Sequence, residues 1–123
     1  MNLLLDTHIV LWWLDDNPAL SSAVKHRIAH GENLVFLSAA VVWEIRIKEA
    51  LGKLDIPSDF SLVLDRQPFE KLAVKVEHAQ ALKDLPPHHR DPFDRMLIAQ
   101  AVTEGLTIAT HDPVFEKIFR SSP

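Results

Sequence analysis

The chain has 123 residues, of which 47% are hydrophobic and 24% are charged, with only 3 glycines and no cysteine. These values predict one globular domain over residues 1–120 with a short tail at residues 121–123, and they argue against a disulfide or thiolate framework. The formal net charge of −4 argues against a protein that holds nucleic acid through overall positive charge.

Four short apolar runs along the chain predict β-strands at residues 3–5, 34–37, 72–74 and 106–109. Because none of these runs alternates strictly with polar residues, we expect strands that are buried on both faces. Helical patterns lie between them at about residues 8–15, 21–30, 39–53, 58–66, 77–84 and 93–104, with a short helix after Asp112. Strands separated by helices predict an α/β fold around a parallel sheet of four or five strands.

The first apolar run is too short for a signal peptide, and no segment approaches the roughly 18 uninterrupted apolar residues of a membrane span. We therefore expect a cytoplasmic protein without a membrane partner.

Two aspartates follow predicted strands, at the edge where parallel α/β sheets bind their ligands. Asp6 comes directly after the first strand, and Asp112 comes shortly after the last. Both residues also suit the N-cap of a helix, and for either residue taken singly capping is the better explanation.

Two further acids interrupt apolar helix stripes. Glu44 shares a stripe with Ala40 and Ile47, and Asp94 extends the stripe of the helix that follows it. A buried carboxylate is costly unless it is paired or binds a metal. The alternatives are that Glu44 borders the stripe and reaches water or an arginine, and that Asp94 only fills the first turn of a helix capped by Asp91. Convergence of all four acids at one edge favours a shared site, which capping does not predict.

Clustered carboxylates raise one another's pKa and need a compensating cation. Oxygen ligands without cysteine favour Mg²⁺ or Mn²⁺. Such an ion activates water and neutralises phosphate charge, which suits hydrolysis of a phosphodiester. Because no histidine pair fits cleavage through a cyclic phosphate, we expect in-line attack of water that leaves 5′-phosphate and 3′-hydroxyl ends.

Four segments occur in a fixed order from one end of the chain to the other: LLDTH at 4–8, SAAVVWEI at 38–45, HRDPFDRMLIAQA at 89–101 and THDPVF at 110–115. Together they resemble the PIN-domain family, and specifically the VapC-like ribonuclease toxins of type II toxin–antitoxin pairs. The resemblance implies a three-layer α/β/α sandwich and a Mg²⁺- or Mn²⁺-dependent endoribonuclease that acts on RNA. It also implies a cognate antitoxin and a homodimer.

Carried over position by position, the resemblance implies catalytic, metal-binding acids around one or two ions, namely Asp6, Glu44, Asp94 and Asp112. It further suggests supporting roles for Thr7 and Thr110, whose hydroxyls would orient a ligand carboxylate or a water, and for Asp91 as an outer acid.

Three basic residues lie near these acids in the sequence, and Arg46, Lys48 and Arg95 are therefore candidates for contact with RNA. Solvated helix faces explain them equally well. Trp12 and Trp13 put two rings on different helix faces, so that either one ring is exposed for a partner or both pack under neighbouring helices. The competing function is a catalytically silent PIN-like module that binds RNA or protein and takes up no catalytic ion.

Overall fold

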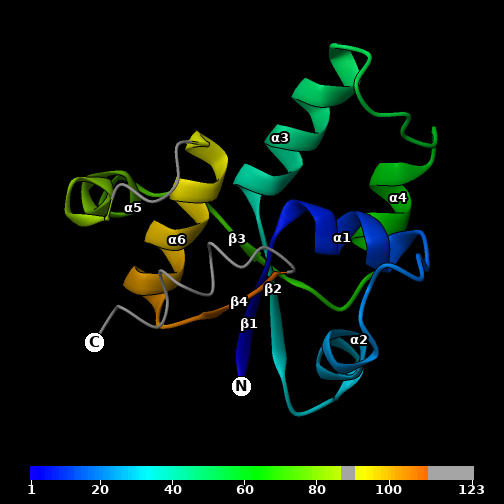
Figure 1. Ribbon diagram of the computed structural model, residues 1–123, viewed down its shortest axis with the longest axis horizontal. Coiled ribbons are helices and arrows are strands. Elements are labelled where there is room, and N and C mark those ends of the chain that lie inside the picture. Colours follow the sequence, from blue (N-terminus) through cyan, green and yellow to red (C-terminus); the bar gives the residue numbers. More distant parts are fainter. Residues whose placement is uncertain (87–90, 111–123) are drawn as a thin grey trace.

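The computed structural model describes residues 1–86 and 91–110, and all statements below concern these residues. Figure 1 shows helices alternating with short strands. The elements in chain order are β1 (Asn2–Leu5), α1 (Thr7–Leu14), α2 (Ser22–Ala29), β2 (Leu34–Ser38), α3 (Ala39–Ala50), α4 (Phe60–Asp65), β3 (Glu70–Leu72), α5 (Val76–Ala81), the 3₁₀ helix η1 (Leu82–Asp84), α6 (Pro92–Glu104) and β4 (Thr107–Ala109).

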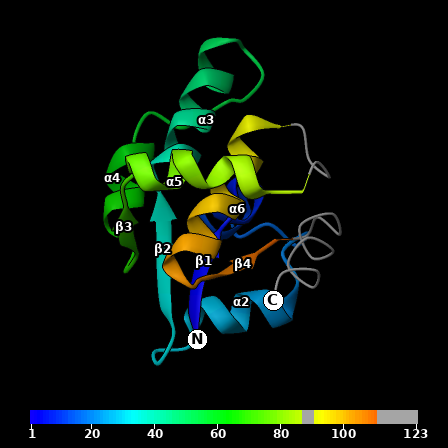
Figure 2. The ribbon, with the colours of Figure 1, turned by 90° about the vertical axis from the view of Figure 1, so that its left-hand side faces the viewer.

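The four strands form a parallel sheet in the order β3-β2-β1-β4. Helices α5 and α6 lie on one side of this sheet, whereas α1, α2 and α4 lie on the other (Figure 1). Figure 2, turned by 90°, has α5 and α6 in front of the strands. The predicted three-layer α/β/α sandwich around a parallel sheet is therefore confirmed.

Strand β1 lies at the centre of the core. Its Leu3, Leu4 and Leu5 are each no more than 1% exposed, and Leu4 is in register with Phe36 of β2 and Ile108 of β4. A strand with a neighbour on each edge and helices on both faces has no polar side. Residues 3–5 are therefore all apolar because every side of β1 is covered by protein.

The predicted position and burial of the third strand are wrong. The strand lies at residues 70–72, two residues earlier than expected, and Glu70 and Lys71 on it are exposed. Among the described strands it pairs only with β2, so that one of its edges stays unpaired. Charged side chains protect such an edge strand from association, which accounts for their presence here.

The helices begin at the side-chain caps that the sequence contains. Asp6, Ser21, Ser38 and Asp91 each accept a hydrogen bond from a backbone N–H of the following helix, at α1, α2, α3 and α6 respectively. Helix α6 ends at Gly105, whose φ of 68° is in the left-handed region that glycine adopts without strain. The helix expected after Asp112 lies outside the described residues.

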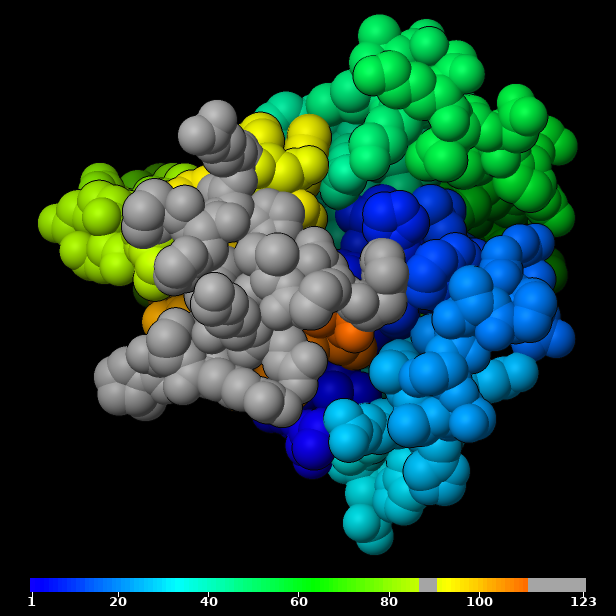
Figure 3. Space-filling model, viewed as in Figure 1, coloured from blue at the N-terminus to red at the C-terminus, as the bar shows by residue number. Residues whose placement is uncertain are grey.

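The strand order creates a switch point between β1 and β4. The chain moves from β1 through β2 to β3 in one direction, and then returns across the sheet through α5 and α6 to β4. Ligands of open parallel sheets bind at the carboxyl ends of the strands on either side of such a point. In Figure 3, α3 and α4 (teal to green) occupy the upper right of the molecule, and α4 packs on the core through Phe60 and Leu64. In the part of the chain that the structure describes, every helix is too short or too polar to cross a lipid bilayer.

Candidate active site at the carboxyl edge of the sheet

Asp6 lies where β1 ends and α1 begins, and it is only 4% exposed. Its backbone N–H donates to the Ala109 carbonyl at 3.2 Å, which ties it to the end of β4. Its Oδ1 accepts the N–H of Ile9 at 2.8 Å, and its Oδ2 accepts the hydroxyl of Thr110 at 2.5 Å. Capping of α1 therefore accounts for one oxygen of this carboxylate, while the other turns toward the switch point.

Glu44 lies on the second turn of α3 and is also 4% exposed. Its Oε1 accepts the Thr7 hydroxyl at 2.5 Å, and its Oε2 forms a salt bridge of 2.7 Å with Lys48 Nζ one turn further along α3. Because Thr7 directly follows Asp6 in the chain, this hydrogen bond holds the Glu44 carboxylate at the N-terminus of α1. Glu44 is therefore buried within the stripe, and its basic partner is Lys48 in place of the water or arginine of the alternative.

The N-terminus of α6 contributes two further acids. Asp91 Oδ1 accepts the N–H groups of Phe93 at 2.8 Å and Asp94 at 3.2 Å, so that Asp91 caps this helix. Asp94 is half-buried in the first turn. Helix α6 returns along the sheet to feed β4, which puts its N-terminus at the carboxyl edge beside α3 (Figure 1).

The charge of Lys48 connects Glu44 with these acids. The hydrogen bond to Glu44 raises the pKa of the Lys48 ammonium above its usual value. Partial burial opposes this rise, and the negative charges of Glu44, Asp91 and Asp94 add to it. Three carboxylates from two helices therefore act on one ammonium group.

Of the four predicted ligands, Asp6, Glu44 and Asp94 thus lie at the carboxyl edge of the sheet, where the structure also puts Thr7, Thr110 and Asp91. Asp112 lies outside the described residues, and its role stays a prediction.

The donor set fits a hard divalent cation. Oxygen ligands from Asp and Glu are those that Mg²⁺ and Mn²⁺ prefer. A carboxylate offers about four lone-pair sites, so the threonine hydrogen bonds orient Asp6 and Glu44 without preventing coordination. Carboxylates that bind metals are typically held in place by hydrogen bonds of this kind.

All three candidate RNA contacts have protein partners of their own, and that of Lys48 is Glu44. Arg46 binds Glu49 at 2.8 Å and the Ser61 hydroxyl at 2.7 Å, and its guanidinium lies over the Phe60 ring. Arg95 donates to the carbonyls of Leu82 and Pro86, both at 3.2 Å. Contact of these residues with RNA remains a prediction.

A buried polar network next to the site was missed in the sequence. Ser38 donates to Gln100 Oε1 at 2.6 Å, and Gln100 Nε2 donates to the Ala73 carbonyl at 3.3 Å and lies 3.5 Å from His78 Nδ1. Gln100, Ser38 and His78 are all fully buried. Gln100 interrupts the apolar stripe of the predicted helix at residues 93–104, and this polar residue could have predicted a buried hydrogen-bond network.

His78 also belongs to a group of metal-ligand types with Glu77 and Glu104. The histidine Nδ1 accepts the N–H of Lys75 at 2.9 Å, so that its ring proton resides on Nε2, which faces Glu104 at 3.5 Å. A protonated Nε2 cannot coordinate a metal. This group is better explained as a structural link between the start of α5 and α6.

The structure decides between the two alternatives for Trp12 and Trp13. Trp12 and Trp13 are half-buried against the core, and Trp13 Nε1 donates to Gln67 at 3.0 Å. Trp43 is instead the exposed tryptophan, with 62% of its surface accessible and its ring edge-on to Phe93 at 5.0 Å. Packing of both residues under neighbouring elements is therefore the correct alternative for positions 12 and 13.

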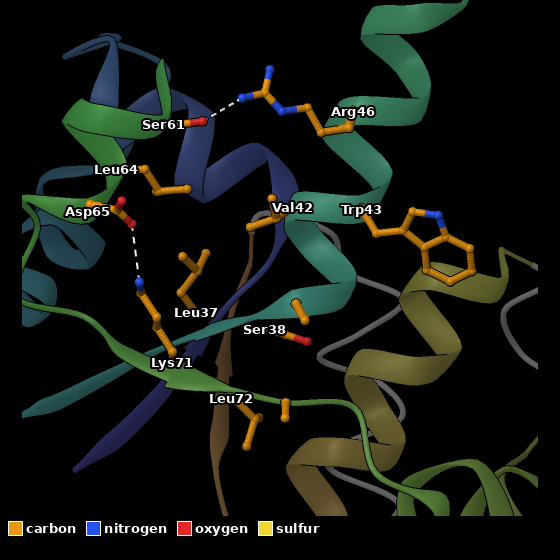
Figure 4. A pocket seen from close by; sticks show the side chains of 12 residues that line it. Leu37, Ser38, Val42, Trp43, Arg46, Ser61, Leu64, Asp65, Lys71 and Leu72 are labelled. Atoms are coloured by element: carbon orange, nitrogen blue, oxygen red, sulfur yellow. Dashed lines mark hydrogen bonds and ion pairs between the residues drawn. The ribbon is translucent and has the colours of Figure 1, made fainter. Parts of the chain in front are cut away.

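Trp43 lies between two hollows on the surface. One, of about 740 Å³, lies between α3, α4 and β3, and Figure 4 shows the Arg46–Ser61 and Lys71–Asp65 contacts at its margins. The other, of about 470 Å³, is almost entirely apolar and is lined by Ala39, Ala40, Trp43, Val74, Leu82, Pro92, Phe93 and Met96. In Figure 4 the Trp43 ring is turned from α3 toward α6, away from Ser61 and Asp65.

A parallel α/β sandwich with carboxylates at the carboxyl edge of its sheet, beside the switch point, defines the class of protein. Residues 3–120 match the family model of the PIN domain, and the chain belongs to this family. Comparison with curated proteins gives no match.

Solved structures share the fold. VapBC2 from Rickettsia felis, bound to a DNA fragment from its promoter, has a TM-score of 0.72 and 17% identity, over 96% of this chain and 93% of that one. VapBC-1 from nontypeable Haemophilus influenzae has a TM-score of 0.67 and 15% identity, over 98% and 93%. FitAcB from Neisseria gonorrhoeae has a TM-score of 0.54 and 21% identity, over 92% and 89%.

Proposed function

We propose that the chain is a Mg²⁺- or Mn²⁺-dependent endoribonuclease, the VapC-like toxin of a toxin–antitoxin pair. The observation that carries this proposal is that Asp6 and Glu44 are both buried at the carboxyl edge of the sheet and each accept a threonine hydroxyl, with Asp94 in the first turn of α6. Membership of the PIN domain family supports it independently. Helix capping alone does not explain why acids from three different elements lie at one edge of the sheet.

Asp6, Glu44 and Asp94 would hold one or two cations, and Asp112 is proposed as the fourth ligand. A bound divalent cation would supply an activated water and neutralise charge on the scissile phosphate. The protein's own part is orientation. Thr110 fixes the outer oxygen of Asp6, and Thr7 fixes one oxygen of Glu44, so that both carboxylates are held in place before substrate arrives. Asp91 caps the N-terminus of α6, and its negative charge also acts on Lys48.

Cleavage of total RNA in Mg²⁺, Mn²⁺ or EDTA tests the proposal, with Asp6→Asn beside the wild type. We expect cleavage in both metals, none in EDTA and none by the variant. Products should carry 5′-phosphate and 3′-hydroxyl ends, because attack by water does not involve the 2′-hydroxyl. A 2′,3′-cyclic phosphate on the products would refute the mechanism.

A catalytically silent RNA- or protein-binding module is the second candidate. The exposed Trp43 and the apolar hollow beside it favour contact with a macromolecule, whatever the chemistry at the acids. Titration with Mn²⁺ separates the two functions. A nuclease should bind Mn²⁺ in a way that Asp6→Asn abolishes, whereas a silent module should show no difference between the wild type and Asp6→Asn.

We further propose a cognate antitoxin and a homodimer as partners and a cytoplasmic location. The likeness in fold to the VapBC and FitAcB complexes supports a protein partner. The Trp43–Phe93 pair supports self-association, because an apolar surface of this kind is costly to leave in water. Light scattering should give twice the chain mass for the wild type and a smaller mass for Trp43→Ser, and a monomeric wild type would refute the dimer.

A further inference from the structure

The salt bridge between Lys48 and Glu44 differs from the other lysine pairs of the structure in its burial. The carboxylate side chain of Glu44 is 5% exposed and that of Lys48 is 36% exposed. In the pair of Lys25 with Asp16, which has a similar N···O distance of 2.8 Å, the corresponding values are 82% for the carboxylate and 53% for the lysine. Exposed pairs of this kind contribute little, whereas a buried carboxylate needs its partner.

Lys48 also occupies a position in which a second cation is unfavourable. Its Nζ lies 2.7 Å from Glu44 Oε2, and Asp91 and Asp94 act on the same ammonium. A divalent ion on Glu44 and Asp94 would have this positive charge as a near neighbour. Like charges a few ångströms apart repel modestly in bulk water and more strongly where the protein partly excludes water.

The lysine is able to leave. It is partly exposed in the last turn of α3, and its four-carbon stem lets the ammonium swing into solvent without moving the helix. Glu44 would stay oriented, because its other oxygen is held by Thr7 from α1. Release of Lys48 therefore leaves a carboxylate that is already positioned for coordination.

We propose that Lys48 is the resident counter-cation of the acidic site: its ammonium neutralises and positions Glu44 in the metal-free protein, and cation binding displaces it. This inference rests on the proposed metal-dependent function and adds a competitor from within the chain. It assigns Lys48 a role toward the metal in place of a contact with RNA. The lysine stabilises the apo-protein and at the same time weakens its affinity for metal.

The test compares Lys48→Gln with Lys25→Gln, which removes the same charge from an exposed pair. Calorimetric titration with Mn²⁺ should give a dissociation constant roughly tenfold lower for Lys48→Gln than for the wild type, since a positive charge beside a dication is lost. In EDTA the same variant should unfold at a lower temperature, because Glu44 loses its partner. Lys25→Gln should change neither quantity, and Lys48→Arg should not tighten binding.

A measurement on the wild type makes the test independent of how well Lys48→Gln folds. The side-chain ammonium resonance of Lys48, assigned by its absence from Lys48→Arg, should be visible in EDTA and should shift or disappear as Mg²⁺ saturates the protein. A resonance that Mg²⁺ leaves unchanged overturns the inference.

The outcomes separate the inference from the function on which it rests. If Mn²⁺ binds the wild type but not Asp6→Asn, and Lys48→Gln binds it no more tightly, Lys48 is not a competitor although the metal site stands. If no Mn²⁺ binding depends on Asp6, the proposed function itself is refuted. Tighter binding by Lys48→Gln together with an Asp6-dependent site supports both.

Discussion

Asp6 carries two roles that substitution can separate. Its Oδ1 caps α1 through the Ile9 N–H, and its Oδ2 accepts the Thr110 hydroxyl at the sheet edge. In Asp6→Asn the amide oxygen can keep the cap, and the new NH₂ group can donate to a rotated Thr110 hydroxyl. In Asp6→Ala both interactions are lost.

The expected energies follow from these contacts. Asparagine and aspartate cap helices about equally well, so Asp6→Asn should change the free energy of unfolding by less than about 1 kcal/mol. Loss of the cap and of the Thr110 hydrogen bond in Asp6→Ala should cost about 2 kcal/mol. For a domain of this length, that loss lowers the melting temperature by roughly 5–10 °C.

Thermal unfolding in EDTA, followed by circular dichroism, measures both variants, and RNA cleavage in Mn²⁺ measures activity. Asp59→Ala is the matched control, because Asp59 stands at the N-cap of α4 without a side-chain hydrogen bond, and its loss should leave stability almost unchanged. We expect both Asp6 variants to be inactive and only Asp6→Ala to melt early. Equal destabilisation by Asn and Ala, or cleavage by Asp6→Asn, would show that the two roles are assigned wrongly.

Three further substitutions test the frame around the site. Gln100→Leu should lower the free energy of unfolding by about 2–4 kcal/mol in a urea titration, because the Ser38 hydroxyl and the Ala73 carbonyl lose their buried partner; a neutral effect would contradict the network. Thr7→Val should cost about 1–3 kcal/mol in the same assay, since Glu44 Oε1 loses its donor, and unchanged stability would argue against that hydrogen bond. Gly105→Ala should cost about 1 kcal/mol from its positive φ alone, as no atom lies within 4 Å of the added Cβ, whereas Gly31→Ala should cost nothing; equal effects at both glycines would refute this reasoning.

Local patterns in the sequence predicted the central part of the fold. The apolar run at residues 3–5 and the caps at Asp6 and Asp91 depend on neighbours within a few residues, and the structure has a buried β1 and helices that begin at those caps. The candidate site acids could be proposed from the sequence for the same reason. A carboxylate that interrupts an apolar stripe, as Glu44 and Asp94 do, is visible in the helical period alone.

The pairing of side chains from distant segments could not be predicted from such local patterns. Thr7 bonds to Glu44 across 37 positions, and Ser38 bonds to Gln100 across 62. Lys48 stands one helical turn after Glu44, a spacing that favours ion pairs, yet nothing in the spacing says that the pair lies beside α6.

The sequence by itself determined a parallel α/β sheet, the starts of its helices and the acids that follow its strands, because the period of burial and the chemistry of caps act within one element. Only the tertiary structure decided that β3 is an exposed edge strand, that Gln100 is a buried link and that Lys48 lies among carboxylates. Strand order and helix packing bring groups together across the sheet, and the energies of those contacts depend on separations that the linear order of residues does not contain.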